Sequence, residues 1–165
     1  MVRDLETICS RYHVVPALWA HAEAMAPMMR PGDREEVWAA GGVGPLEGLE
    51  ISLAASLYAW TWLIDDVPAC MFGVGSPSIL SGTGIPWLLS GELVNRHWRP
   101  FLSYYRPFLD RMRDDFTLLT NWVDARYGLA IRWLGWMGFE IMPPAPHGPF
   151  NILHHRFEMR RERGA

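Results

Sequence analysis

Asp124 and Arg126 are the residues whose types and spacing most directly offer chemistry in this chain. They stand between the apolar run 118–123, which predicts a strand, and the segment 127–137, whose pattern predicts a helix. The carboxylate of Asp124 can cap that helix, or it can pair with Arg126 or another arginine. A charged pair at the end of a strand can also bind a ligand. The sequence leaves these interpretations open.

Other chemically reactive residue types are present without the spacing that a site needs. His154 and His155 are adjacent, and neighbouring strand residues face opposite sides, so the two cannot readily share one metal ion. The other four histidines are scattered: His13, His21, His97 and His147. The serines of the loop 75–82 lack the G-x-S-x-G pattern of an activated nucleophile. The sequence predicts no metal site and no serine nucleophile.

Composition narrows the class of protein. A chain of 165 residues, half of them apolar and a fifth charged, is long enough for one domain with a core. The net charge of −3 gives no strong nucleic-acid signal. Cys9 and Cys70 belong to no metal-spaced set, so we expect reduced thiols. No apolar stretch is long enough for a membrane span, and the N-terminal residues lack the order of a signal peptide.

The elements that must position Asp124 and Arg126 follow from periodicity and turn residues. We expect 1–30 to be mostly helical with a break at Pro16, and Asp33 to cap a short helix with Glu36 at its third position. The predicted helices after that break are 34–40, 45–55, 92–115 (with Pro100 near its start and Pro107 as a kink) and 127–137. The predicted strands are 57–64, 68–74, 84–89, 118–123, 139–142 and 152–159, with a proline-rich loop after Met142.

This order predicts one α/β (α+β) domain over 1–160, with a mixed, mostly antiparallel sheet and helices on both faces. Its N-terminal part, 1–48, is expected to be helical, and the part 49–159 to contain the sheet. Residues 160–165 are expected to form a polar tail.

The same order of elements resembles the GNAT acyltransferase fold over roughly 49–159. The most specific part is 123–139, where Ala130 and the pair Gly138-Phe139 match the family's Asn-x-x-Ala, helix, Gly-Phe pattern. The resemblance implies a cleft between two strands that separate, with Asp124 facing it. It also makes Tyr127 and Asp124 weak catalytic candidates, and an acyl-CoA the cofactor to consider.

Several functional positions depart from the family pattern. Tyr127 stands where the family has Asn, and Leu134 stands where it has the tyrosine that protonates the departing thiolate. Leucine cannot supply a proton. The family's R/Q-x-x-G-x-G/A loop points backbone amides at the coenzyme's pyrophosphate, but here Gly91 is the single glycine of the region and Glu92 adds a carboxylate. The resemblance therefore implies a vestigial cofactor region at Leu89, Ser90, Gly91, Asn95 and Arg96, and we expect no cofactor to bind there.

A narrower resemblance covers more of the chain. The runs that carry it are Phe72–Val74, Leu80–Leu89, Tyr127–Phe139 and His155–Phe157. They are similar to a family of small internal virion or core proteins of short-tailed bacteriophages, which are GNAT-like in shape. This resemblance implies a non-catalytic protein of the virion or the host cytoplasm, acting in the internal core, in head or tail assembly, or in genome delivery.

Partners are expected on the predicted helix 127–137. Arg132, Trp133 and Trp136 put a cation and two indoles on this short helix, and arginine and tryptophan are typical interface anchors. We expect one face of the helix to pack in the core and the other to contact a partner. Other phage structural proteins are the first expectation, and a host protein or a second copy of the chain remains open.

The alternative is an active N-acyltransferase that binds acetyl-CoA in an unusual way. The preserved order of elements and Gly138-Phe139 favour it. Tyr127 or Tyr58 would then be the proton donor. A third hypothesis is an early host-interaction protein, which the sequence cannot separate from the first.

Overall fold

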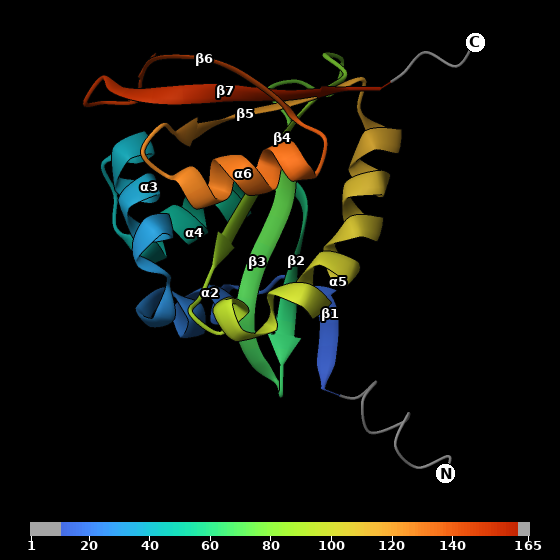
Figure 1. Ribbon diagram of the computed structural model, residues 1–165. Coiled ribbons are helices and arrows are strands. Elements are labelled where there is room, and N and C mark those ends of the chain that lie inside the picture. Colours follow the sequence, from blue (N-terminus) through green and yellow to red (C-terminus); the bar gives the residue numbers. More distant parts are fainter. Residues whose placement is uncertain (1–10, 162–165) are drawn as a thin grey trace.

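A seven-stranded sheet in the order β1-β2-β3-β4-β5-β7-β6 forms the centre of the computed structural model, which describes residues 11–161 (Figure 1). The strands are β1 (Tyr12–Pro16), β2 (Ser56–Ile64), β3 (Val67–Gly75), β4 (Thr83–Ser90), β5 (Leu118–Asp124), β6 (Glu140–His147) and β7 (Ile152–Arg160). Neighbouring strands are antiparallel except for the parallel pair β4–β5. The predicted mixed, mostly antiparallel sheet is confirmed.

Helices cover both faces of the sheet, as predicted. They are α2 (Trp19–Met25), the 3-10 helix η1 (Ala26–Met28), α3 (Pro31–Gly41), α4 (Pro45–Ala54), α5 (Val94–Asp115) and α6 (Gly128–Trp136). Alternation along β3 builds two cores: Phe72 packs with residues of α5 and α6, whereas Met71 packs with residues of α2, α3 and α4. In Figure 1 α5 and α6 lie on the near face.

Helix α5 follows the expected helical spacing. Phe101, Tyr105, Leu109 and Met112 are buried, at steps of four, four and three residues. The backbone leaves helical geometry at His97 (φ −124°, ψ 23°), so Pro100 falls in the first turn after this break, where its missing N–H costs little. The φ/ψ angles stay helical at Pro107, and the predicted kink of the helix axis there stays a prediction.

The expectation of a helical N-terminal part was wrong for Tyr12–Pro16. This segment is β1, an outer strand whose register pairs Tyr12 with Ile64 and Pro16 with Trp60. The ring of Tyr12 stacks on Trp62 at 5.5 Å, and Val14 packs against the same core. Pairing with β2 therefore decides the structure of these residues. Residues 1–10, with Cys9, lie outside the described part.

The proline-rich segment after Met142 is not a loop. It is part of β6, which pairs with β7 through a register shift between Ile141 and Pro144. Among residues 11–161, β7 is the only strand next to β6, so the prolines need not donate to a second strand. Arg160, expected in the tail, ends β7 opposite Leu118. Within residues 11–161, no helix is long and apolar enough to cross a membrane.

The sheet separates in its middle, between β4 and β5. Only two register pairs join these strands, Thr83 with Leu118 and Gly84 with Leu119. Two residues later Pro86 has no N–H to give, and the side chain of Asn121 reaches its carbonyl instead, with Nδ2 donating to the Pro86 oxygen at 2.9 Å. The strands therefore diverge toward Ser90 and Asp124, and the separation opens a cleft.

Candidate functional site

A cleft of about 1100 Å³ lies where β4 and β5 diverge. It is lined from β4 and β5, from α3 and α4 on one side of the sheet, and from α5 and α6 on the other. Large side chains from these helices and strands make most of its wall apolar. Four of its residues are large apolar side chains that are about half exposed or more: Ile51, Trp98, Leu129 and Trp136. A mostly apolar hollow with a few polar groups is typical of a binding site.

The polar end of the cleft is centred on Asp33, which is 2% exposed. Its Oδ2 accepts hydrogen bonds from Arg30 Nε at 2.8 Å, Tyr127 OH at 3.0 Å and Ser90 Oγ at 3.3 Å. These donors come from the residue before α3, the residue before α6 and the end of β4. Burial raises the pKa of the Asp33 carboxyl, and Arg30 and the other donors offset only part of this.

Glu36 lies one turn further along α3 and also lines the cleft. Its Oε1 accepts a hydrogen bond from the backbone N–H of Asp124 at 3.2 Å, which ties α3 to the end of β5. Burial first, and then the charge of Asp33, raise the pKa of Glu36 to about 8. At neutral pH this carboxyl is therefore mostly protonated, and it can donate a proton or a hydrogen bond.

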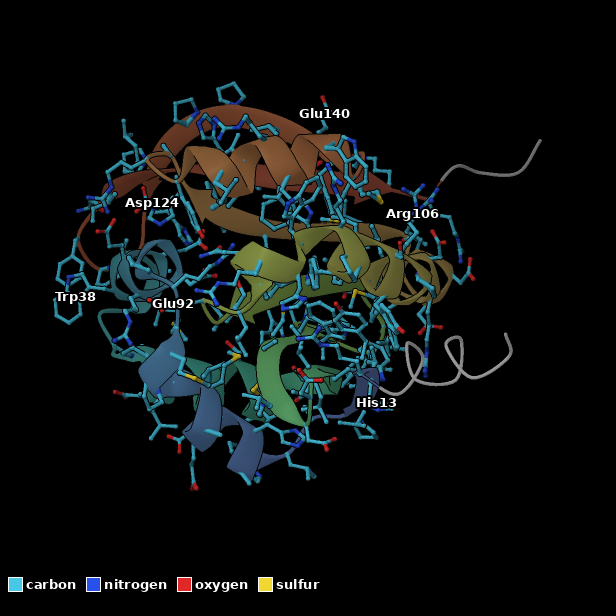
Figure 2. All side chains as sticks on the ribbon, turned by 60° about the horizontal axis from the view of Figure 1, so that its bottom comes forward. His13, Trp38, Glu92, Arg106, Asp124 and Glu140 are labelled. Atoms are coloured by element: carbon cyan, nitrogen blue, oxygen red, sulfur yellow. The ribbon has the colours of Figure 1, made fainter. Side chains whose placement is uncertain are left out.

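Asp124 and Arg126 form a local ion pair. Arg126 NH2 lies 2.6 Å from Asp124 Oδ2, and the backbone N–H of Arg126 donates to Asp124 Oδ1 at 2.8 Å. Burial raises the pKa of the Asp124 carboxyl, but these bonds and the guanidinium charge outweigh it and hold the pKa below its usual range. In Figure 2 Asp124 lies beside α3, although its carboxylate is held by Arg126. Pairing with Arg126 is thus the interpretation that the geometry gives.

The sequence interpretation of Asp33 and Glu36 was wrong. Helix α3 begins at Pro31, so Asp33 lies in its first turn and is not the N-cap, and its side chain turns toward β4 and α6. Both acids belong to the cleft, which sequence reasoning missed. No local signal could have shown this, because Ser90 and Tyr127 are 57 and 94 residues away from Asp33.

Most backbone amides between β4 and the first turn of α5 already have partners, those of Gly91, Glu92, Val94, Asn95 and Arg96. Gly91 donates to Ala69 at 2.8 Å and Glu92 donates to Met28 at 2.9 Å, so the connection is fastened to β3 and η1. The next amides close tight turns, with Val94, Asn95 and Arg96 donating to the carbonyls of Gly91, Glu92 and Leu93. A Cβ on Gly91 would lie 3.3 Å from the Met28 oxygen, so this glycine serves the close approach of two backbones.

The residues predicted as a vestigial cofactor region do not form one surface. Leu89 and Ser90 are buried at the end of β4, and Ser90 is committed to Asp33. Asn95 and Arg96 are exposed, and Asn95 receives a long contact of 3.5 Å from Arg30. Leu134, in the position where the resemblance expects a tyrosine, is buried in the core beneath α6.

Helix α6 divides its predicted interaction residues between core and solvent. The ring of Trp133 packs between α6 and α5, 5.6 Å from Phe101 and 5.3 Å from Tyr105. Trp136 is 64% exposed and Arg132 is exposed. Among residues 11–161, no group of three or more His, Cys, Asp or Glu side chains could hold a metal ion.

Neither a protein-family model nor a curated protein matches the sequence. Solved structures do match over almost the whole chain. Ard1 from Thermoplasma volcanium has 11% identity and a TM-score of 0.70, covering 91% of this chain and 97% of its own. A GCN5-related N-acetyltransferase from Kribbella flavida has 15% identity and a TM-score of 0.66, with coverages of 92% and 99%.

YncA from Salmonella typhimurium, solved with its cofactor acetyl-CoA, has 14% identity and a TM-score of 0.63 and covers 94% of this chain and 96% of its own. Identities this low carry no statement about activity. The order of elements, the sheet and these matches agree, and the chain has the fold of the GNAT acetyltransferases.

Proposed function

We propose that this protein is a non-catalytic, GNAT-like component of a bacteriophage particle, which acts by binding other particle proteins. Its place is the internal core or the head and tail assembly, with a role in genome delivery, so it is found in the virion and in the host cytoplasm. We expect the binding contacts to be made by the cleft and by its rim, the exposed lining residues Trp98 and Trp136. No thioester would be turned over.

The proposal depends mainly on the hydrogen bonds that the backbone amides between β4 and α5 donate within the protein. A nucleotide-bearing acyl donor needs free backbone N–H groups at the start of the helix to hold its pyrophosphate. Here the amides of Gly91, Glu92, Val94, Asn95 and Arg96 all donate to carbonyls of the protein itself. Freeing the amides of Gly91 and Glu92 would break the contacts of this connection with β3 and η1, and freeing the other three would open its tight turns. These bonds support the proposal that the connection does not hold a coenzyme A pyrophosphate.

The chemistry expected on α6 is also missing. Leu134 is 8% exposed and contributes to the core, so neither its type nor its place offers a proton to a leaving group. Tyr127, two turns earlier, donates a hydrogen bond from its hydroxyl to Asp33, and burial raises the pKa of this phenol. The hydroxyl is therefore engaged within the protein.

The particle assignment is supported by the sequence resemblance to internal virion proteins of short-tailed phages. The run Leu80–Leu89, which carries much of it, forms the end of the β3–β4 loop and most of β4. Mass spectrometry of purified particles tests this part. Peptides of this chain in particles that survive protease treatment of their surface are the expected result. Their absence would favour an early host-interaction protein.

Isothermal titration with acetyl-CoA tests the non-catalytic part. We expect no binding at micromolar concentrations, while YncA, titrated in parallel, serves as the positive control. A micromolar dissociation constant for this chain would overturn the proposal.

One observation favours the second candidate, an N-acyltransferase. Glu36 lies in an open cleft with its pKa raised to about 8, which is the range of a carboxyl that exchanges protons near neutral pH. This candidate requires a donor held without the pyrophosphate cradle. Transfer of radiolabelled acetyl groups to any amine, lost in a Glu36→Gln variant that still folds, would establish it.

A further inference from the structure

The loop between β3 and β4 presents two large apolar side chains to solvent. Ile79 is 87% exposed and Leu80 is 96% exposed, and the whole tip from Pro77 to Ser81 is exposed. We call the pair Ile79 and Leu80 the knob. The sequence carries no charged residue between Asp66 and Glu92, so the knob stands in an uncharged segment. A partner that covers these two side chains would remove their apolar surface from water, which favours binding.

The knob is held in place by hydrogen bonds of its own loop. Ser76 Oγ donates to the Thr83 carbonyl at 2.8 Å, and Ser81 Oγ donates to the Ser78 carbonyl at 2.7 Å. The base of the loop is fastened to the start of β5, where Thr117 donates its backbone N–H to Gly82 at 2.8 Å. A rigid loop loses little conformational freedom when it binds, so the knob is preorganised for a partner.

The cleft is a hollow of matching chemistry. The charged groups at its polar end are already neutralised within the molecule: Arg30 pairs with Asp33, and Glu36 is mostly protonated at neutral pH because burial and Asp33 raise its pKa to about 8. Arg132 also lines the cleft, but its side chain is exposed and can keep its charge in water at the edge of the cleft. An uncharged apolar group can therefore enter without leaving a charge unpaired. The exposed rim side chains, Trp98 and Trp136 among them, would gain a cover at the same time.

The knob of one copy cannot fill its own cleft. The loop precedes Thr83 at one end of β4, whereas the cleft is lined by Pro86 to Ser90 toward the other end. The loop is also fastened to Thr117 and cannot fold over. A knob and a hollow at different places on one chain define a head-to-tail contact, which repeats into rings or open filaments.

We propose that copies of this chain assemble head to tail, with the knob of one copy inserted into the cleft of the next. The contact is heterologous, so an open assembly has a free knob at one end and a free cleft at the other, whereas a ring has neither. A second copy of the chain is then the protein that binds in the cleft. The inference rests on the proposed function in one respect: the cleft must be free of coenzyme.

Sedimentation velocity of complementary variants tests the contact. I79S/L80S removes the knob and keeps the cleft, whereas W136E puts a charge on the cleft rim and keeps the knob. Leu18→Ser, at another exposed apolar residue, is the matched control. We expect the wild type and Leu18→Ser to grow beyond dimers as concentration rises from micromolar to millimolar. Each of the other two variants alone should stay monomeric.

The mixture of I79S/L80S and W136E gives the sharpest result. The knob of W136E can enter the intact cleft of I79S/L80S. The substituted loop of I79S/L80S and the charged cleft of W136E cannot bind a further copy. An equimolar mixture should therefore form a one-to-one dimer and nothing larger. The proposal is overturned if the wild type stays monomeric at millimolar concentration, or if the mixture of two folded variants does. Assembly of I79S/L80S like the wild type would also overturn it.

Two further measurements test the other candidates, a lipid surface as the partner of the knob and a coenzyme as the occupant of the cleft. A monomeric wild type that binds vesicles of phosphatidylcholine and phosphatidylglycerol, with binding lost in I79S/L80S, would assign the knob to a lipid surface and sink the proposal. Titration of acetyl-CoA into monomeric I79S/L80S measures coenzyme binding in a cleft that no knob can occupy. The titration therefore tests the proposed function, and sedimentation tests the self-assembly, so that failure of one can be distinguished from failure of the other.

Discussion

Three carboxyl groups differ in how their charge is compensated: Asp33 and Glu36 line the cleft, and Asp124 lies next to it at the end of β5. Asp33 has the guanidinium of Arg30 at 2.8 Å, and Asp124 has that of Arg126 at 2.6 Å. Glu36 forms no ion pair with any cation of residues 11–161, and its hydrogen bond comes from a backbone amide. Burial and the neighbouring charge of Asp33 therefore act on it with little opposition, and the pKa rises from 4.5 to about 8. Folding thus requires Glu36 to hold a proton that the unfolded chain releases.

This difference predicts how stability depends on pH. Because the folded-state pKa of Glu36 lies above the unfolded value, the native state binds the extra proton between these values. The contribution of Glu36 should be fully present below the unfolded pKa and fall by up to ~1.4 kcal/mol per pH unit as pH rises toward about 8. Glu36→Gln keeps the acceptor for the Asp124 amide and cannot ionise. Its free energy of unfolding relative to wild type should therefore increase with pH across this window.

Urea denaturation at several pH values measures the effect. The adjacent Glu35 is exposed, so Glu35→Gln is the matched control for removing one carboxyl group from α3. Parallel curves for wild type and Glu36→Gln would show that Glu36 ionises freely in the folded state.

At the scale of the elements, Gly48 and Gly135 show two different effects of a glycine in a helix, one on packing between helices and one on helix propensity. A Cβ on Gly48 in α4 would overlap Val37 Cγ1 of α3, and the buried, β-branched Val37 cannot easily turn away. A Cβ on Gly135 in α6 would meet no atom of the described residues within 4 Å. Gly48 is therefore what lets α3 and α4 approach, whereas Gly135 only weakens its helix.

Alanine at the two positions should have opposite effects. Gly48→Ala should destabilise the protein by ~1–3 kcal/mol through overpacking between α3 and α4. Gly135→Ala should stabilise it by ~0.5–1 kcal/mol, because alanine has the higher helix propensity. Thermal unfolding of both variants checks the signs. A gain in stability for Gly48→Ala would mean that α3 can shift without loss of packing.

Most elements could be predicted from local pattern, and the failures have a common cause. The aromatic-rich run of β2 and the apolar face of α5 fix their own periodicity, so their predictions were close to the observed bounds. Tyr12–Pro16 and the prolines of β6 became strands because a neighbouring strand pairs with them. That pairing is a long-range effect, and tertiary contacts override local preference in such short segments.

The candidate site was less predictable than the elements. The pairing of Asp124 with Arg126 is local and stood among the sequence interpretations. The network of Asp33 with Ser90 and Tyr127 joins three distant parts of the chain and has no local sign. The catalytic roles offered for Tyr127 and Asp124 stay predictions, as does the partner-binding role of Arg132, Trp133 and Trp136.

At the scale of the whole molecule, the division of the sheet between β4 and β5 creates the cleft and is also the weak line of the fold. Two register pairs hold the strands together before Pro86 interrupts the ladder. Beyond that point Asn121 spans the gap: its Nδ2 donates to the Pro86 carbonyl at 2.9 Å and its Oδ1 accepts the Trp122 N–H at 2.8 Å. One amide side chain thus replaces the missing strand pairing.

Asn121→Ala should therefore loosen the molecule along this line. It removes both bonds, and the half-buried Pro86 carbonyl and Trp122 amide lose their partners, so we expect a loss of ~1–3 kcal/mol in the free energy of unfolding. Asn95→Ala is the control, since exposed Asn95 receives only the 3.5 Å contact from Arg30 and should cost little. Hydrogen exchange locates the effect: amides of β5 should exchange faster in Asn121→Ala, while those of β2 and β3 change only with global stability. Equal stability of the two variants, or uniform changes in exchange, would mean that the two parts of the sheet are held together by α5 and α6 rather than by this side chain.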